Sequence, residues 1–395
     1  MSIPILVLNC GSSSVKYQMI DVESEEVLAS GLVEKIGLAD GNLTHKTGGD
    51  EHRIDQTITD HTAALQLVSQ AFDTWGPALH SVVAVGHRTV HGGDTFRDTT
   101  LITDAVIDGL IRLSPLAPLH NPPAIAGIRA AQSMLPDVPH VAVFDTAFFS
   151  TLPAEAYTYA INREVAEKYG IRKYGFHGTS HSFVSKAAAA FMGADLAEVN
   201  QIVCHLGNGA SISAVAGGIA IEASMGLTPL AGLVMGTRSG DVDPGVFAYL
   251  EREAGMTSQQ IDDLLNKKSG MAGLADGSSD FRDLWAKMDA GDEHAQLAHD
   301  VYVHRLISYI GAYMAILGRT EYLVFTAGVG ENANRTRAIV IDRLAGFGIR
   351  LDAEANNSRI KSPTIISTPD SAVTVLVVPT NEELAMARET YRVTR

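Results

Sequence analysis

The chain has 395 residues, more than a single hydrophobic core usually holds, so two domains are expected. Hydrophobic residues make up 46% of the chain and charged residues 19%, a balance that excludes a disordered protein. The formal net charge of −15 argues against nucleic acid or an anionic membrane surface as the main partner. An anionic ligand would therefore be held by a few local cations.

Two cysteines, Cys10 and Cys204, are too few for a disulfide framework. We expect both to be small buried core residues in a reducing compartment. No apolar stretch is long enough to cross a bilayer, and the first residues lack the basic region of a signal peptide. A cytoplasmic protein is therefore expected.

The first motif, residues 5–17, reads I-L-V-L-N-C-G-S-S-S-V-K-Y. It predicts a buried strand that turns at Gly11 and returns as a second strand. The turn offers backbone N–H groups, three hydroxyls and the Lys16 ammonium, but no carboxylate. This set suits a phosphate, although a plain serine-rich turn is an alternative interpretation.

A similar hairpin recurs at residues 202–213, I-V-C-H-L-G-N-G-A-S-I-S. The repeat favours the phosphate interpretation over the plain turn. Two such hairpins, one in each half, suggest a duplicated fold that holds a phosphate chain between its halves. In the first half, predicted strands and helices alternate, which indicates an α/β sheet whose ligands gather at the carboxyl ends of strands. The domain boundary is expected near Ser150, within F-F-S-T-L-P.

The second half contains a long amphipathic stretch, 294–317, which predicts a helix. Strands are expected at 322–326 and 373–378. Thr380 and Glu383 have the spacing of a capping box for a terminal helix.

Several common motifs are absent. The chain has no G-x-x-x-x-G-K-[ST] and no Gly-Lys pair, so it is not a P-loop protein. No G-x-G-x-x-G follows a strand, which disfavours a dinucleotide site. The pairs His87/His91 and His177/His181 have i, i+4 spacing, but they lie in glycine-rich segments without the glutamate of H-E-x-x-H, which disfavours zinc.

Arg88 and Arg238 each lie in a glycine-rich loop and not on a charged helix face. A surface salt bridge is the usual fate of an arginine. A planar guanidinium also binds phosphate or carboxylate through paired hydrogen bonds, which is what an acidic protein needs to hold anions.

Asp145 and Glu382 each follow a predicted buried strand. Either carboxylate could satisfy a helix N-terminus, above all Glu382 just after Thr380. The alternative is Mg²⁺ coordination, partly through water. His177, flanked by Phe176, is either structural or a donor to a transferring phosphoryl group. Apolar residues in or beside these loops fill the core or line a small apolar pocket: Val90, Leu119, Phe176 and Pro229.

Eight segments occur in order along the chain: L-N-C-G-S-S-S-V-K, G-H-R-T-V-H-G-G, F-D-T-A-F-F, Y-G-F-H-G-T-S-H, H-L-G-N-G-A-S, M-G-T-R-S-G-D-V-D-P, G-V-G-E-N and P-T-N-E-E. Together they resemble the acetate kinase (acetokinase) family over almost the whole chain. The resemblance implies an α/β fold, the duplicated actin-like ATPase (ribonuclease H-like) fold of the acetate and sugar kinase, Hsp70 and actin superfamily. Two domains, 1–150 and 151–383, would then surround a nucleotide cleft, with helix 384–395 packing back on the first.

The resemblance also implies an activity. Family members transfer the γ-phosphoryl group of ATP reversibly to acetate, giving acetyl phosphate and ADP, with Mg²⁺ as cofactor and Mn²⁺ as an alternative metal. They are homodimers, and the partners expected here are acetate, ATP and a second copy of the chain, with no nucleic acid and no membrane.

Carried over residue by residue, the resemblance assigns Asn9 and Glu382 to the magnesium site, Arg88 to the substrate and Asp145 to the role of catalytic acid. His177 and Arg238 would stabilise the transition state. The methyl pocket would be formed by Val90, Leu119, Phe176 and Pro229. The nucleotide contacts would be Lys16, His205, Leu206, Gly207, Asn208, Gly209, Asp280, Phe281, Arg282, Gly328, Val329, Gly330, Glu331 and Asn332. Ser12 and Ser14 of the first hairpin would line the phosphate path.

The charge of the acceptor limits the mechanisms that can be expected. A carboxylate acceptor is already ionised near neutral pH, so it needs no general base, and the obstacle is repulsion between two anions. We therefore expect Asp145 to align Mg²⁺ or to orient Arg88 and not to move a proton. Two rivals remain at this stage. One is a kinase for propionate or another short-chain carboxylate, and the other is an ATP-driven conformational switch without metabolite chemistry.

Overall fold

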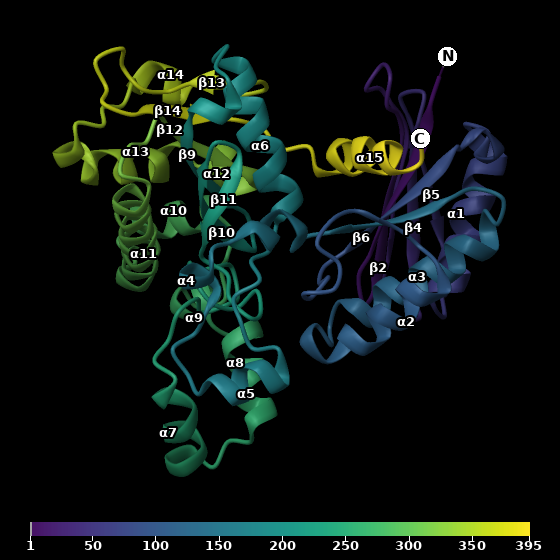
Figure 1. The fold of residues 1–395 in the computed structure, drawn as a ribbon, viewed down its shortest axis with the longest axis horizontal. Helices are drawn as coiled ribbons and strands as arrows, with labels where there is room; N and C mark the ends of the chain where they lie inside the picture. Colours follow the sequence, from purple (N-terminus) through teal and green to yellow (C-terminus); the bar gives the residue numbers. More distant parts are fainter. Residues whose placement is uncertain (1) are drawn as a thin grey trace. The chain divides into compact units, whose positions relative to one another are not determined.

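The computed structural model describes residues 2–395 and forms two compact units. The first unit runs to Ser150 and includes Asn381–Arg395, and the second comprises Thr151–Thr380. Figure 1 shows a mixed sheet with flanking helices in each unit. The nucleotide cleft that the sequence predicts between two domains stays a prediction.

The first unit is built on an eight-stranded sheet in the order β5-β4-β3-β2-β1-β6-β8-β7. Its strands are β1 (Pro4–Cys10), β2 (Ser14–Asp21), β3 (Val27–Glu34), β4 (Asn42–Thr47), β5 (Asp50–Asp55), β6 (Ala84–Thr89), β7 (Thr100–Leu101) and β8 (His140–Phe144). Its α-helices are α1 (His61–Trp75), α2 (Asp104–Leu113), α3 (Asn121–Met134) and α15 (Glu382–Val393).

The second unit is built on a six-stranded sheet in the order β11-β10-β9-β12-β14-β13. Its strands are β9 (Asn200–Leu206), β10 (Ala210–Ala216), β11 (Ile219–Ala223), β12 (Tyr322–Thr326), β13 (Thr364–Ile365) and β14 (Thr374–Val377). Its α-helices are α4 (Ala154–Tyr157), α5 (Arg163–Tyr169), α6 (Gly178–Phe191), α7 (Gly245–Ala254), α8 (Ser258–Lys267), α9 (Gly270–Leu274), α10 (Phe281–Asp289), α11 (Glu293–Leu317), α12 (Ala327–Asn332), α13 (Asn334–Arg343) and α14 (Ala353–Asn357).

The two sheets share one arrangement. In each, three antiparallel strands are followed by two parallel ones, β3-β2-β1 then β6-β8 in the first and β11-β10-β9 then β12-β14 in the second. The predicted hairpins are the corresponding pairs β1–β2 and β9–β10. The predicted duplication of an α/β fold is confirmed, and the repeated hairpin was its signal.

The central strand β1 is buried on both faces because helices cover each face. Leu6 and Leu8 join the hydrophobic core that contains α1 and the end of α3. Val7 points the other way, where it shares a cavity with Met386 of α15. Alternation along a strand sends successive side chains to opposite faces, so a strand covered twice reads as a continuous apolar run. Cys10 and Cys204 are both buried free thiols, as predicted.

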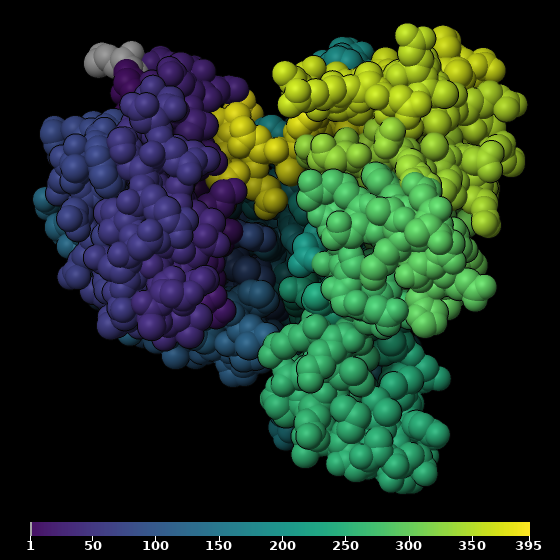
Figure 2. Space-filling model, turned by 180° about the vertical axis from the view of Figure 1, so that it is seen from behind, coloured from purple at the N-terminus to yellow at the C-terminus, as the bar shows by residue number. Residues whose placement is uncertain are grey.

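In the second unit the core sits between the sheet and long helices. Helix α11 packs on β10 and β9, and α6 packs on β9 and β12. The predicted helix at 294–317 corresponds to α11. Figures 1 and 2 show that the segment carrying α7 and α8 projects as a lobe from this unit. No helix within residues 2–395 is long and apolar enough to cross a membrane.

The predicted capping box for the terminal helix is wrong. Asn381 is the N-cap of α15, and its side chain accepts a hydrogen bond from Leu384 N. Thr380 N instead donates to Glu331, and Glu383 pairs with Lys16. An Asn N-cap satisfies the free backbone N–H groups of the first helical turn just as a Thr would. A T-x-x-E spacing that starts one residue before the true N-cap cannot be distinguished in the sequence from a real capping box.

Helix α15 approaches β6 at a glycine. A Cβ built on Gly86 would lie 2.3 Å from Thr390 Oγ1 and 3.4 Å from Thr390 Cβ. We therefore expect Gly86→Ala to lower the free energy of unfolding by about 1–3 kcal/mol, because overpacking forces the helix to shift. The loss would be measured as a lower urea midpoint of unfolding. In a Thr390→Ala background the same change should cost much less, since the clashing oxygen is gone. Equal costs in both backgrounds would contradict close packing of α15 on β6.

Candidate active site

A small cavity of about 120 Å³ lies in the first unit where β1, β2, β6 and α15 meet. Four residues predicted to be functional line it: Asn9, Lys16, Arg88 and Glu382. Parallel pairing of β1 with β6 brings the carboxyl ends of these strands side by side, which places Asn9 and Arg88 at the same edge. Residues that lie far apart in the sequence, from Asn9 to Glu382, therefore line the same cavity.

Arg88 is held by Asp145 through two hydrogen bonds. Arg88 Nε donates to Asp145 Oδ1 at 3.1 Å, and Arg88 Nη2 donates to Asp145 Oδ2 at 2.8 Å. The Asp145 side chain is only 2% exposed and that of Arg88 is 25% exposed. The charge of Asp145 raises the pKa of Arg88 above its usual value. A bidentate pair fixes the plane of the guanidinium, so this arginine is a rigid cation and not a mobile surface residue.

Glu382 faces the same cavity in α15 without capping its own helix. Burial raises the pKa of this carboxyl, opposed by the positive charge of Arg88 and reinforced by Asp145. Lys16, the predicted nucleotide contact, forms an ion pair with Glu383. The cavity thus contains two cations and two carboxylates from the chain.

The other predicted residues of this unit lie outside that cavity. Ser12 is exposed in the turn of the first hairpin, and Ser14 begins β2, where its carbonyl accepts a hydrogen bond from Gly11 N at 2.8 Å. Val90 is half-buried just after β6, and Leu119 is 55% exposed. The phosphate and methyl-pocket roles of these residues stay predictions.

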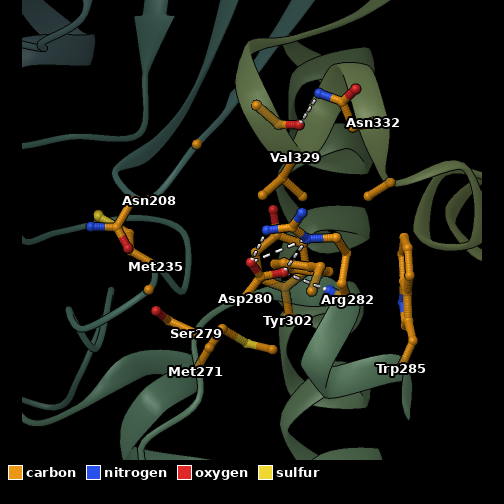
Figure 3. Close-up of a pocket in the computed structure, with 15 residues that line it drawn as sticks. Asn208, Met235, Met271, Ser279, Asp280, Arg282, Trp285, Tyr302, Val329 and Asn332 are labelled. Atoms are coloured by element: carbon orange, nitrogen blue, oxygen red, sulfur yellow. Dashed lines mark hydrogen bonds and ion pairs between the residues drawn. The ribbon is translucent and has the colours of Figure 1, made fainter. Parts of the chain in front are cut away.

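A larger cavity of about 440 Å³ lies in the second unit (Figure 3). Predicted nucleotide contacts that line it come from three segments: Gly207 and Asn208, then Asp280, Phe281 and Arg282, then Gly328, Val329 and Asn332. The segments follow β9, begin α10 and follow β12. Sheet edge and helix start thus form one pocket, large enough for part of a nucleotide.

Asp280 and Arg282 form a closed pair inside this cavity, visible at the centre of Figure 3. Arg282 Nη2 donates to Asp280 Oδ2 at 2.6 Å, and Asp280 also caps α10 by accepting from Arg282 N at 2.8 Å. The hydrogen bonds from Arg282 lower the pKa of Asp280 to about 2.

Helix α12 is fastened by side chains that do not line the cavity. Glu331 Oε1 accepts from Ala327 N at 2.9 Å and from Thr380 N at 3.1 Å. Arg337, only 2% exposed, donates to Gly330 O at 2.8 Å and to Glu331 O at 2.9 Å. Gly330 and Glu331 therefore hold α12 in place, while Gly328, Val329 and Asn332 face the cavity.

His177 and Arg238 both lie next to Gly209. A Cβ built on Gly209 would lie 3.4 Å from His177 Nε2 and 3.6 Å from Arg238 Nη1. His177 Nδ1 is hydrogen-bonded to Ser211 Oγ at 2.9 Å, and its ring stacks on His205 at 4.3 Å between centroids. Two nitrogen-bearing groups thus converge on the small space that the glycine leaves open.

Arg238 is a cation of a different kind from Arg88. Its Nη1 donates to Pro229 O at 3.3 Å, and within residues 2–395 no carboxylate pairs with it. Burial lowers the pKa of Arg238 from its usual value. Within residues 2–395 its positive charge is therefore not neutralised by a carboxylate.

Three further predicted site residues of this unit are buried or half-buried: Phe176, Leu206 and Pro229. Phe176 is 2% exposed and Leu206 is 1% exposed, while Pro229 is half-buried and accepts the Arg238 bond. A core role is sufficient for the two buried side chains, and the methyl-pocket roles of Phe176 and Pro229 stay predictions.

Comparison with known proteins decides the family. The model of the acetokinase family matches residues 4–388. An acetate kinase of Clavibacter michiganensis subsp. michiganensis is 53% identical over 392 residues, which is 99% of each chain. The chain belongs to the acetokinase family.

Solved structures in this family agree with the fold. The crystal structure of Porphyromonas gingivalis acetate kinase matches with a TM-score of 0.95 and 43% identity over 100% of both chains. A propionate kinase from Francisella tularensis subsp. tularensis SCHU S4 matches with a TM-score of 0.93 and 41% identity, covering 99% of this chain and 100% of that one.

Several lining residues of the larger cavity were missed by the sequence reasoning: Met235, Gly236, Met271, Ser279, Trp285, Tyr302 and Ala333. Trp285 had a usable signal, since it is one of two tryptophans and follows Asp280–Arg282 by one helical turn. The methionines had none, because an apolar residue beside a glycine-rich loop reads as ordinary core.

The raised pKa of Glu382 predicts how stability depends on pH. The pKa of this carboxyl in the folded chain lies above its ordinary value of 4.5. Its contribution to stability is therefore fully present at a pH below 4.5 and is lost as the pH rises through the folded pKa. We therefore expect Glu382→Gln to unfold at higher urea than wild type at pH 8, with the difference shrinking towards pH 4.5. A variant that is less stable at pH 8 would show that the Glu382 charge is favourable in the fold.

Proposed function

We propose that this chain transfers the γ-phosphoryl group of ATP to the carboxylate of acetate, giving acetyl phosphate and ADP, and that it catalyses the reverse reaction. A carboxylate oxygen forms a bond to the γ-phosphorus while the bond from that phosphorus to the ADP oxygen breaks, and ADP keeps the electron pair. The observation that carries the proposal is Arg238, a partly buried cation for which residues 2–395 supply no carboxylate partner. It lies beside His177 at Gly209, and its Nη1 is 4.0 Å from Sδ of Met235, which lines the larger cavity.

Arg88 is proposed to bind the acceptor carboxylate. Its guanidinium is already oriented by the two hydrogen bonds that it donates to Asp145, and its remaining donors suit a second carboxylate. Acetate is ionised near neutral pH, so no residue needs to remove a proton. The two bonds to Arg88 favour an orienting role for Asp145 over the role of catalytic acid.

The second unit is proposed to bind the nucleotide. Its cavity offers apolar faces from Met235, Met271 and Trp285, which suit a nucleoside, beside the polar pair Asp280–Arg282. Arg238 and His177 are assigned to the oxygens of the transferring group, where preorganised donors act on developing charge. Positioning and charge stabilisation are sufficient for phosphoryl transfer.

Mg²⁺ is the metal that fits the residues present, with Mn²⁺ as an alternative. Asn9 and Glu382 supply oxygen donors at one cavity, whereas residues 2–395 contain no cluster of three His, Cys, Asp or Glu side chains that could hold a metal. A metal that keeps several waters and binds phosphate oxygens suits such a sparse set. When bound, it would neutralise phosphate charge. The predicted cytoplasmic location also remains part of this proposal.

An assay of ADP formation tests the function directly. We expect ADP release to require both acetate and Mg²⁺, and hydroxylamine to trap an acyl phosphate in equal amount. Arg238→Ala should lower kcat by about 10²–10³-fold, the typical cost of losing one charge-stabilising donor. Its Kd for ADP should stay near that of wild type.

Arg319→Ala is the matched control, since Arg319 is a 72% exposed arginine of the same unit, and it should keep full turnover. ADP release at full rate without acetate would overturn the kinase assignment in favour of an ATPase switch. Loss of folding in Arg238→Ala would indicate a structural arginine instead.

Asp145→Asn separates an orienting role from proton transfer. The variant removes the charge that holds Arg88, and we expect kcat/KM for acetate to fall by about 10²-fold because small misplacements carry that cost. Raising the pH or adding small bases should restore nothing. Arg88→Lys also loses the bidentate geometry, so the double variant should be little worse than either single one. Recovery of Asp145→Asn by added base would return the role of acid or base to Asp145.

A preference for propionate is the second candidate, favoured by the likeness to the Francisella propionate kinase. One methylene is worth only ~1–3 kcal/mol of discrimination in an apolar pocket, so close relatives can differ in preference. Initial rates with acetate, propionate and butyrate decide between the two.

A homodimer is also proposed, and the lobe that carries α7 supports it. Helix α7 has no buried residue, and apolar side chains stay exposed on and beside it, including Tyr249 at 58%, Val242 at 39% and Phe247 at 36%. Exposed apolar patches of this kind mark protein contacts. Sedimentation should give twice the 42.0 kDa chain mass, and Phe247→Glu with Tyr249→Glu should give the monomer. A monomeric wild type would contradict the proposal.

A further inference from the structure

A chain of hydrogen bonds runs from His177 into the core of the second unit. His177 Nδ1 bonds Ser211 Oγ at 2.9 Å, Ser211 Oγ bonds His181 Nε2 at 2.8 Å, and His181 Nδ1 bonds Ser213 Oγ at 2.8 Å. His181 and Ser213 are 0% exposed and Ser211 is 2% exposed. The two serines lie two residues apart on β10 and therefore share a face of the strand, while His181 lies in the first turns of α6 and His177 is its N-cap residue.

Ser211 couples the two histidines because a hydroxyl has a single hydrogen. Its oxygen contacts one ring nitrogen of each histidine, so it can donate to only one of them. For both bonds to form, the other nitrogen must carry the hydrogen and donate to the serine. If both nitrogens carried hydrogens, the buried Ser211 O–H would have no acceptor among residues 2–395, so the tautomer of His181 sets the tautomer of His177.

Ser213 decides the direction of the chain. Within residues 2–395 its hydroxyl has one hydrogen-bond partner, His181 Nδ1. A hydrogen on Nδ1 would leave the Ser213 O–H buried without an acceptor, which is an unfavourable state. The lone pair therefore stands on Nδ1, where it accepts from Ser213.

His181 is neutral, since burial lowers its pKa well below the usual value, and neighbouring His205 adds to this effect. A neutral ring that accepts at Nδ1 carries its hydrogen on Nε2 and donates it to Ser211. Ser211 then donates to His177 Nδ1. His177 is left with its hydrogen on Nε2, the atom that lies beside Gly209 and Arg238.

We propose that His181 is a positioning residue that fixes His177 as a neutral imidazole with its hydrogen on Nε2, ready to donate to a phosphoryl oxygen. This inference rests on the proposed function for the identity of the acceptor. His177 then adds a directed donor next to the cation Arg238, and not a second positive charge. His205 of β9 stacks on His177, and its Nδ1 is hydrogen-bonded to Ser180 Oγ at 2.8 Å. It is therefore not part of the hydrogen-bond chain through Ser211.

The first experiment reads the tautomer without using activity. The full chain is labelled with ¹⁵N-histidine, and His177 is assigned by comparison with His177→Gln. At pH 7.5 without nucleotide, the spectrum should show the Nε2–H tautomer for both His177 and His181. An Nδ1–H tautomer or an imidazolium at His177 would overturn the proposal.

The second experiment compares two replacements of His181. A glutamine amide can donate to Ser211 from the place of Nε2–H, whereas leucine cannot donate. We expect His181→Leu to lower kcat by about 10²-fold with KM for ATP nearly unchanged, and His181→Gln to keep kcat within about 10-fold of wild type. Equal losses in the two variants would overturn the proposal.

Ser211→Ala keeps the test decisive if His181→Leu does not fold. It should lower kcat similarly and return a mixture of His177 tautomers in the ¹⁵N spectrum, and unchanged tautomers would contradict the coupling. Ser185→Ala is the control, because Ser185 is a 1% exposed serine of α6 that bonds Ser182 O and should leave kcat unchanged. If wild type makes no acyl phosphate, the proposed function fails, while the tautomer measurement still judges the coupling.

Discussion

The parallel pairing of the central strands decides where the polar residues at the strand ends come together in this protein. β1 lies beside β6 and β9 lies beside β12, so the polar residues that end these strands share an edge in each sheet. Asn9 and Arg88 meet in this way in the first unit, as do Gly207–Asn208 and Gly328–Val329 of α12 in the second. Each sheet buries its middle strands completely, and only their ends offer polar groups to a ligand.

The electrostatics of the two units answer the question posed by a net charge of −15. Arg88 is neutralised by Asp145 and gains a fixed orientation, which suits a geometric task such as holding a planar carboxylate. Arg238 donates to a carbonyl and is not neutralised by a carboxylate of residues 2–395, which suits the proposed stabilisation of a transferring anion. Under the proposed function, one residue type would serve two tasks because its partners differ.

The two hairpins, 5–17 and 202–213, could be predicted because apolar runs broken by glycine and small polar residues follow local rules. Cys10 and Cys204 were predicted as buried for the same reason. The prediction of a capping box at Thr380 was wrong because the N-cap is the residue at which the helical conformation begins. Asn381, one position later, is also a good capping residue and occupies that place. Trp285 and the methionines of the larger cavity were missed because the same apolar residue types fill a core and line a pocket.

The sequence by itself determined the family, the duplicated α/β fold and a set of candidate polar site residues, since these follow from ordered motifs and local patterning. Only the tertiary structure decided how these residues are paired. It joined Arg88 to Asp145 across 57 positions and Lys16 to Glu383 across 367. It also connected His177 to Ser213 through His181. Hydrogen bonds act over about 3 Å in space without regard to separation along the chain, so no local pattern records them.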